Sequence, residues 1–255
     1  MINKETNAFQ RVALVSGGMG GIGTAICQAL ASTGIKVVTT YHKSGDHAHA
    51  ERWQEEQKTQ GFDIDKIYMD IADPTSCQTA VGELLQRYEK IDILVNNAGI
   101  TRDKLCHKMA LNDWQQVIGV NLNSVFYLTQ PILDSMLQNA YGRIINISSI
   151  NAQKGQRGQV NYAAAKAGMH GFTKSLAQEV ANKHITVNTI SPGYINTAMV
   201  MAVREDVREQ IIAQIPVGRL GEPSEIARVV AFLADDASSF ITGANISVNG
   251  GQYVS

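Results

Sequence analysis

Cysteine is scarce in this chain of 255 residues, and the few that it has form no pattern. Cys27, Cys77 and Cys106 are an odd, widely separated set without a CxxC pair, so neither a disulfide framework nor a zinc site is favoured. The six histidines include no HExxH sequence. We therefore expect no metal site in this protein.

Long apolar runs and an excess of one charge are also missing. No apolar run approaches the roughly 20 residues of a membrane-spanning helix, and the opening MINKETNAFQ lacks the apolar core of a signal peptide. The 22 basic and 23 acidic residues nearly cancel, which does not favour nucleic-acid binding. These absences predict a soluble cytoplasmic protein with neither a membrane nor a nucleic acid as partner.

Short β-branched runs alternate with longer helical stretches along the chain. The runs are nearly continuous in apolar residues, as parallel strands buried on both faces are. The alternation predicts a single α/β domain over residues 11–255, a Rossmann-like doubly wound parallel sheet with helices on both faces, behind an N-terminal extension of residues 1–10. The expected strands include 11–16, 35–41, 91–97, 142–148, 185–191 and 244–251, and the expected helices include 23–33, 74–89 and 225–235.

The first expected strand leads directly into SGGMGGIG, residues 16–23. Gly17, Gly21 and Gly23 permit a tight turn and a close approach of the backbone to a pyrophosphate, and the following helix offers free N–H groups to that anion. The spacing Gly-x3-Gly-x-Gly differs from the commoner GxGxxG, and an ordinary glycine-rich turn is the alternative. The position between a strand and a helix favours dinucleotide binding.

A tyrosine and a lysine stand one helical turn apart in NYAAAKAG, residues 161–168. Positions i and i+4 share a helix face, so Tyr162 and Lys166 would point the same way, and a nearby positive charge lowers the pKa of a phenol. The alternative is an amphipathic helix with a half-buried tyrosine and a solvated lysine. Alone, the pair is weak evidence for a catalytic site.

Four further segments, taken together with these two motifs, carry a resemblance to a known family. They are NNAG at 96–99, Asn121 in GVNLNS, ISS at 147–149 and SPGYI at 191–195. In this order and spacing the chain resembles the short-chain dehydrogenases/reductases from about residue 11 to residue 251. Through GGMGGIGTAICQ, NNAGITRD, QKGQ and SPGYI it most resembles the NADPH-dependent acetoacetyl-CoA reductases; the 3-oxoacyl-[acyl-carrier-protein] reductases share several segments and are the alternative.

The resemblance implies reduction of a ketone by hydride from a nicotinamide. Tyr162 would protonate the ketone oxygen, while Lys166 would lower the pKa of Tyr162 and hold the nicotinamide ribose. Ser149 would hydrogen-bond the substrate carbonyl, and Asn121 would support a water path that resupplies the proton. The alternatives are a loop-capping role for Ser149 and an amide bonded to backbone for Asn121.

The end of the second expected strand bears on the choice of cofactor. Proteins that prefer NAD place an acid there to hold the ribose 2′-hydroxyl. This chain has Tyr41, followed by His42 and Lys43, so NADP(H) is expected, although a solvated turn is the alternative and the glycine loop lacks the usual arginine. By resemblance, Asp70 ends the third strand and meets the adenine. The expected cofactor-binding residues are Gly17, Met19, Gly20, Gly21, Ile22, Gly23, Tyr41, Lys43, Asp70, Asn97, Ala98, Gly99, Tyr162, Lys166, Pro192, Gly193 and Ile195.

The segment 193–223 follows the sixth strand, where a lid would cover the cleft; a surface helix is the alternative. A coenzyme A carrier would need basic or amide groups at the cleft mouth, with Arg157 a doubtful candidate. By resemblance we expect a homotetramer built on the helices around 111–139 and 158–182. A non-catalytic NADP-binding scaffold is expected to lose the proton donor or its lysine, and both are present here. The expected substrate-binding residues are Asp103, Lys108, Ser149, Gln156, Gln159, Tyr162 and Tyr194.

Overall fold

The computed structural model describes residues 10–42 and 47–254, and within them seven parallel strands form one sheet of order β3-β2-β1-β4-β5-β6-β7. The order reverses between β1 and β4, which is where an open α/β sheet opens a crevice beyond its carboxyl ends. The expected doubly wound fold is therefore confirmed. The strands are β1 (Val12–Val15), β2 (Lys36–Tyr41), β3 (Ile64–Tyr68), β4 (Ile93–Asn96), β5 (Gly142–Ile147), β6 (Ile185–Pro192) and β7 (Asn245–Val248).

The central strands are buried on both faces, as their nearly continuous apolar sequences predict. Every residue of β1, β4, β5 and β6 is buried. Leu14 of β1 lies in register with Val38 of β2 on one side and with Leu94 of β4 on the other. The edge strand β7 is only half-buried, since it has a neighbour on one side alone.

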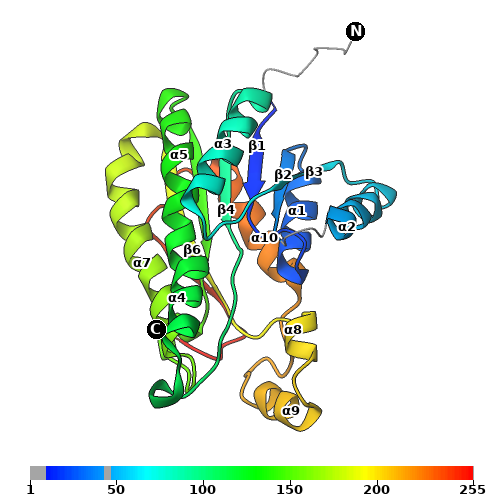
Figure 1. The fold of residues 1–255 in the computed structure, drawn as a ribbon, viewed down its shortest axis with the longest axis vertical. Helices are drawn as coiled ribbons and strands as arrows, with labels where there is room; N and C mark the ends of the chain where they lie inside the picture. The colour runs from blue at the N-terminus through cyan, green and yellow to red at the C-terminus, as the bar shows by residue number, and fades with distance from the viewer. Residues whose placement is uncertain (1–9, 43–46, 255) are drawn as a thin grey trace.

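Helices cover the sheet in two layers, which lie on either side of it in Figure 1. On one face, α1 (Gly21–Ala31) and α10 (Pro223–Ala234) pack against the sheet, with Trp53 of α2 (His47–Thr59) in the same apolar cluster. On the other face, α3 (Pro74–Tyr88), α5 (Ser124–Gln138) and α7 (Val160–Val180) form a second cluster. The helices expected at 23–33, 74–89 and 225–235 are thus present with slightly different ends. No helix among the described residues has the length and apolar character needed to cross a membrane.

The expected helix at 111–139 contains an irregular turn. Helix α4 (Leu111–Ile118) continues into α5 through a π-helical segment, η2 (Gly119–Asn123). Such wide turns frequently occur at functional sites, and this one carries Asn121. The remaining short elements are η1 (Cys106–Lys108), α6 (Asn151–Lys154), η3 (Ala181–Lys183), α8 (Ala198–Met201), α9 (Glu205–Ala213) and η4 (Asp236–Ser238).

Two short helices, α8 and α9, extend beyond the carboxyl ends of the strands, at the lower right of Figure 1. Neither helix contains a buried residue. The base of this segment is fastened: Asn196 N–H donates to the Gly221 carbonyl at 2.7 Å, and Gly221 N–H donates to the Tyr194 carbonyl at 2.9 Å. The segment therefore has a fixed base and an exposed end.

Candidate active site

The glycine-rich loop joins β1 to α1 in a conformation that needs its glycines. Gly17 has a φ of +65°, and a Cβ on Gly23 would lie 2.2 Å from the Gly17 carbonyl oxygen. Helix α1 begins at Gly21, and its N-cap, Gly20, has no side chain with which to cap the first turn. The N–H groups and the positive dipole end of α1 are therefore available to an anion, so this loop fits a pyrophosphate.

The loop is fixed to the end of β4 by hydrogen bonds. The Asn97 and Ala98 N–H groups donate to the Ser16 hydroxyl at 3.0 and 3.1 Å. The Asn97 side-chain amide donates to the carbonyls of Ser16 and Gly17, each at 3.0 Å. Asn97 and Ala98 thus lie against the glycine loop, as expected.

Threonines at the end of β2 hold the other side of the loop. The Thr39 and Thr40 hydroxyls accept from the N–H groups of Gly18 and Gly17 at 2.9 and 3.1 Å. Sequence reasoning identified neither these threonines nor Ser16. In the sequence they could have been found as small polar residues at the point where a buried apolar strand ends.

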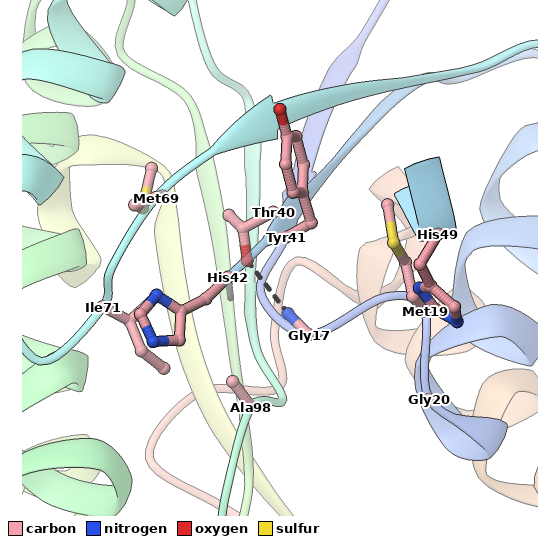
Figure 2. Close-up of a pocket in the computed structure, with 10 residues that line it drawn as sticks. All are labelled: Gly17, Met19, Gly20, Thr40, Tyr41, His42, His49, Met69, Ile71 and Ala98. Atoms are coloured by element: carbon pink, nitrogen blue, oxygen red, sulfur yellow. Dashed lines mark hydrogen bonds between the residues drawn. The ribbon is translucent and has the colours of Figure 1, made fainter. Parts of the chain in front are cut away.

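A cavity of about 230 Å³ lies between the glycine loop and the ends of β2 and β3. It is the pocket drawn in Figure 2, where the Tyr41 phenol points away from Gly17. That phenol instead lies 2.8 Å from His47 Nδ1. Lys43 lies outside the described residues. The lining residues are Gly17, Met19, Gly20, Thr40, Tyr41, His42, His49, Met69, Ile71 and Ala98.

Asp70 does not end the third strand, because β3 ends at Tyr68. It lies two residues farther on, where its carboxylate is 3.9 Å from His42 Nδ1. Its side chain also accepts from the Ala72 N–H at 3.0 Å. Asp70 is therefore near the cavity but partly engaged with its neighbours.

The four expected catalytic residues come from three elements. Ser149 follows β5, Asn121 lies in η2, and Tyr162 and Lys166 lie in the first two turns of α7. Lys166 Nζ is 5.8 Å from the centre of the Tyr162 ring. A Cβ on Gly99 would lie 2.5 Å from Asn121 Oδ1 and 3.5 Å from Lys166 Nζ. Gly99, in the segment after β4, therefore lies against both Asn121 and Lys166.

Asn121 is completely buried, and its side chain hydrogen-bonds to backbone groups. Its amide nitrogen donates to the carbonyls of Ile100 and Val117, each at 2.9 Å, and its oxygen accepts from the Ile100 N–H at 3.1 Å. Asn121 thereby ties the loop after β4 to the π-helical turn. The expected water path stays a prediction.

Burial dominates the electrostatics of Tyr162 and Lys166. Burial raises the pKa of Tyr162, the Ser149 hydroxyl opposes this shift, and the charge of Asp103 adds to it. Burial also lowers the pKa of Lys166, to about 7. Burial decides the direction of the Tyr162 shift, and the expectation that Lys166 lowers the pKa of Tyr162 stays a prediction. Tyr162 is a neutral phenol at neutral pH.

Some of the expected substrate residues form a hydrogen-bonded row. Gln159 Nε2 donates to the Asp103 carboxylate at 2.8 Å, and Asn151 Nδ2 donates to Gln159 Oε1 at 2.9 Å. The Asn151 N–H donates to Ser149 Oγ at 3.1 Å, so the row reaches the expected catalytic serine. Asp103 also acts on Tyr194, whose pKa is raised first by burial and then by that carboxylate.

The other expected residues are more scattered. Lys108 and Gln156 are exposed, on η1 and on the loop before α7. Ile22 packs against the core beneath α1. A Cβ on Gly21 would lie 3.1 Å from Thr197 Cγ2, so the base of the α8–α9 segment lies against the glycine loop. In that same base, Pro192 ends β6, Ile195 is buried, and a Cβ on Gly193 would lie 2.8 Å from Asn249 Cα.

Comparisons with known proteins cover nearly the whole chain. A family model described as enoyl-(acyl carrier protein) reductase matches residues 17–252. An acetoacetyl-CoA reductase of Allochromatium vinosum is 54% identical over 96% of this chain and 99% of its own. The 3-oxoacyl-[acyl-carrier-protein] reductase FabG of Escherichia coli is 44% identical over 96% and 98%.

Among solved structures, the crystal structure of gox2181 superposes with a TM-score of 0.90 at 35% identity, over 95% of each chain. A Rossmann-like sheet with a glycine loop at its switch point implies a nicotinamide cofactor. Because the family model and the Allochromatium vinosum relative match nearly the whole chain, the chain belongs to the short-chain dehydrogenase/reductase family.

Proposed function

We propose that this protein reduces acetoacetyl-CoA to 3-hydroxybutanoyl-CoA with NADPH. The observation that carries the reductase proposal is the pairing of Tyr162 and Lys166 on one helix face, 5.8 Å from ring centre to ammonium, with Ser149 acting on the same phenol. The 54% identity to a protein named acetoacetyl-CoA reductase supports the choice of substrate.

The nicotinamide, when bound, supplies the hydride. Gly17, Gly20 and Gly21 would hold the pyrophosphate, because the loop leaves the first turn of α1 open to an anion. Lys166 would hold the ribose. We propose NADP(H) rather than NAD(H), since Tyr41 stands where NAD-preferring proteins place an acid.

The proton comes from Tyr162 in this proposal. Burial keeps its phenol neutral, so it has a proton to give to the ketone oxygen. Ser149 Oγ would donate to the same oxygen and stabilise its developing negative charge. A buried Lys166 with a pKa of about 7 gains and loses a proton easily near neutral pH, which suits a group that helps restore the phenol.

The α8–α9 segment is proposed as a lid over the acyl group. Met199 and Met201 of α8 are 62% and 48% exposed, which leaves apolar surface to cover a short acyl chain. The exposed Lys108 and Gln156 are proposed to meet the coenzyme A phosphates.

A 3-oxoacyl-[acyl-carrier-protein] reductase is the second candidate, favoured by the 44% identity to FabG. The two are separated by measuring NADPH oxidation with acetoacetyl-CoA and with acetoacetyl carrier protein side by side. We expect a higher kcat/KM with acetoacetyl-CoA. A higher value with the carrier protein would replace the proposed substrate, and turnover of neither would favour a binding protein without catalysis.

A further inference from the structure

A histidine stands one helical turn beyond Lys166 on α7, and the proposed mechanism gives it no role. His170 is half-buried, and its Nε2 lies 2.9 Å from the Oγ of Ser148, which directly follows β5. The same nitrogen lies 3.4 Å from the Oγ of Ser191 in β6. This imidazole therefore joins the helix that carries Tyr162 and Lys166 to the ends of two neighbouring strands.

The other hydrogen bonds of the two serines decide which imidazole nitrogen carries the proton. Ser148 Oγ donates to the Lys166 carbonyl at 2.9 Å, and Ser191 Oγ donates to Asn245 Oδ1 at 2.7 Å. Both acceptors are oxygens without a hydrogen, and a hydroxyl has one proton to give. Each serine can therefore only accept from His170, so Nε2 of this histidine is an N–H donor.

The charge of His170 does not alter these bonds. Burial lowers the pKa of His170, and the positive charge of Lys174, one turn farther along α7, lowers it further. The ring is therefore neutral at neutral pH, with its proton on Nε2. A ring that takes up a second proton does so at Nδ1, and Nε2 remains a donor. The bonds to both serines thus persist on either side of the titration.

Lys166 is held at both of its ends by consecutive residues. Its ammonium donates to the Ile147 carbonyl at 2.7 Å, and its own carbonyl accepts from Ser148. The next residue, Ser149, is the one whose hydroxyl acts on Tyr162. The position of Ser148 therefore affects the spacing between the proposed proton donor, its lysine and the proposed carbonyl-binding serine.

We propose that His170 is a positioning residue for ketone reduction: it holds Ser148 through its Nε2–H and thereby keeps the Lys166 turn of α7 against the end of β5. This inference rests on the proposed function and adds a residue to its site. The imidazole acts through Ser148 and not on the reacting atoms. Because misplacement by about 1 Å can cost about a hundredfold in rate, loss of this donor should slow the chemical step more than it weakens binding.

Two substitutions of His170 separate the hydrogen bond from the volume of the ring. In His170→Gln the side-chain amide can still donate to Ser148, whereas His170→Leu fills the space without a donor. With acetoacetyl-CoA and saturating NADPH, we expect the leucine variant to lose about tenfold or more in kcat. Its KM should change by less than about threefold, and the glutamine variant should keep at least about a third of the wild-type kcat.

A double-mutant cycle shows whether the two residues act as one unit. Ser148→Ala should lower kcat about as much as His170→Leu does. The double variant should be slower than either single variant by no more than about twofold, because the same hydrogen bond is lost in all three.

Nitrogen-15 NMR of the imidazoles reads the tautomer without any substrate. The histidine signal that disappears in His170→Gln should be that of an Nε2–H tautomer above neutral pH. The Nδ1–H tautomer would contradict the inference, because Nε2 could then not donate to Ser148.

Ser238→Ala is the matched control for Ser148→Ala. Ser238 is also buried, and its hydroxyl also donates to a helix carbonyl, that of Phe232 in α10. It lies in η4, whose Asp236 pairs with Arg143 near the start of β5, at the opposite end of the strand from Ser148. Urea unfolding should show a comparable loss of stability in both variants, and Ser238→Ala should keep its kcat.

Wild-type kcat in His170→Leu would overturn the inference, as would a stably folded glutamine variant that is as slow as the leucine variant. Losses that multiply in the double variant would also overturn it, since the two residues would then act independently. An equal loss of kcat in Ser238→Ala would assign the effect to lost stability instead of positioning. Failure of the proposed function is distinct, because the wild type would then not turn over acetoacetyl-CoA, and the variants are compared on the ketone that it does reduce.

Discussion

The ammonium of Lys166 donates a hydrogen bond of 2.7 Å to the carbonyl oxygen of Ile147, the last residue of β5. Lys166 is 2% exposed, so burial removes its ammonium from water, with the Ile147 carbonyl at the carboxyl end of β5 as a hydrogen-bond acceptor. Burial lowers the pKa of Lys166 from 10.5 to about 7. A buried ammonium in this position lowers the free energy of unfolding.

Replacing Lys166 should therefore stabilise the protein while destroying activity. The pKa is lower in the folded than in the unfolded chain, so between about pH 7 and pH 10.5 the unfolded chain binds more protons, and the stability of the wild type rises with pH. Lys166→Met should be more stable at pH 7, by about 1–3 kcal/mol, and the gap should close at high pH. Urea unfolding without cofactor at several pH values measures this, and a constant gap would contradict it.

Tyr162→Phe should abolish ketone reduction and leave NADPH binding within a few fold. The phenol is the proposed proton donor, and the ring that remains fills the same space. Turnover and cofactor fluorescence measure the two effects separately. Residual turnover of a tenth would show that another group gives the proton.

Tyr141→Phe is the matched control for that variant. Its phenol donates to Asp236 at 2.8 Å, just before β5 begins and away from the catalytic residues. It should lose about 1 kcal/mol of stability and keep its activity.

Tyr41→Asp should reverse or erase the preference for NADPH in kcat/KM. A carboxylate at the end of β2 accepts from a ribose hydroxyl and repels a 2′-phosphate. Tyr41→Phe, which removes the bond to His47 without adding charge, should keep the preference. Equal use of both cofactors by the wild type would remove the basis of this prediction.

Lys108→Ala should raise KM for acetoacetyl-CoA severalfold and hardly affect a short ketone ester that has no phosphates. The side chain is exposed at the end of η1, so its contribution should also weaken with salt. Lys183→Ala, before the start of β6, is the control. Equal losses on both substrates would indicate a structural role for Lys108.

Light scattering at micromolar concentration should give the mass of a homotetramer. Large apolar side chains remain exposed on α4, α5 and α7, among them Trp114 at 39%, Phe126 at 55% and Val160 at 40%. Burial of such side chains between subunits stabilises an assembly. A monomeric mass would contradict this prediction.

The sheet could be predicted from sequence because its central strands are buried on both faces. A short run rich in isoleucine and bounded by helical stretches, such as residues 142–148, is typical of a parallel strand buried on both faces. The direction of the pKa shift of Tyr162 could not be predicted, because it depends on how far tertiary packing removes water from the phenol. The π-helical turn at Asn121 could not be predicted from local sequence preferences either. It coincides with hydrogen bonds between Asn121 and the backbone of Ile100, which is distant in sequence.

The fastened base of the α8–α9 segment has a consequence for how this protein can change. Backbone hydrogen bonds between Gly221 and the residues Tyr194 and Asn196 hold the two ends of the segment together. Helices α8 and α9, which lie between these ends, contribute no buried residue to either apolar cluster. Since these helices are proposed as a lid, we expect changes in them to leave the packing of the sheet below as it is. Under the proposed function, we therefore expect substrate range and fold stability to depend on separate parts of the chain, so that each can change during evolution without a loss in the other.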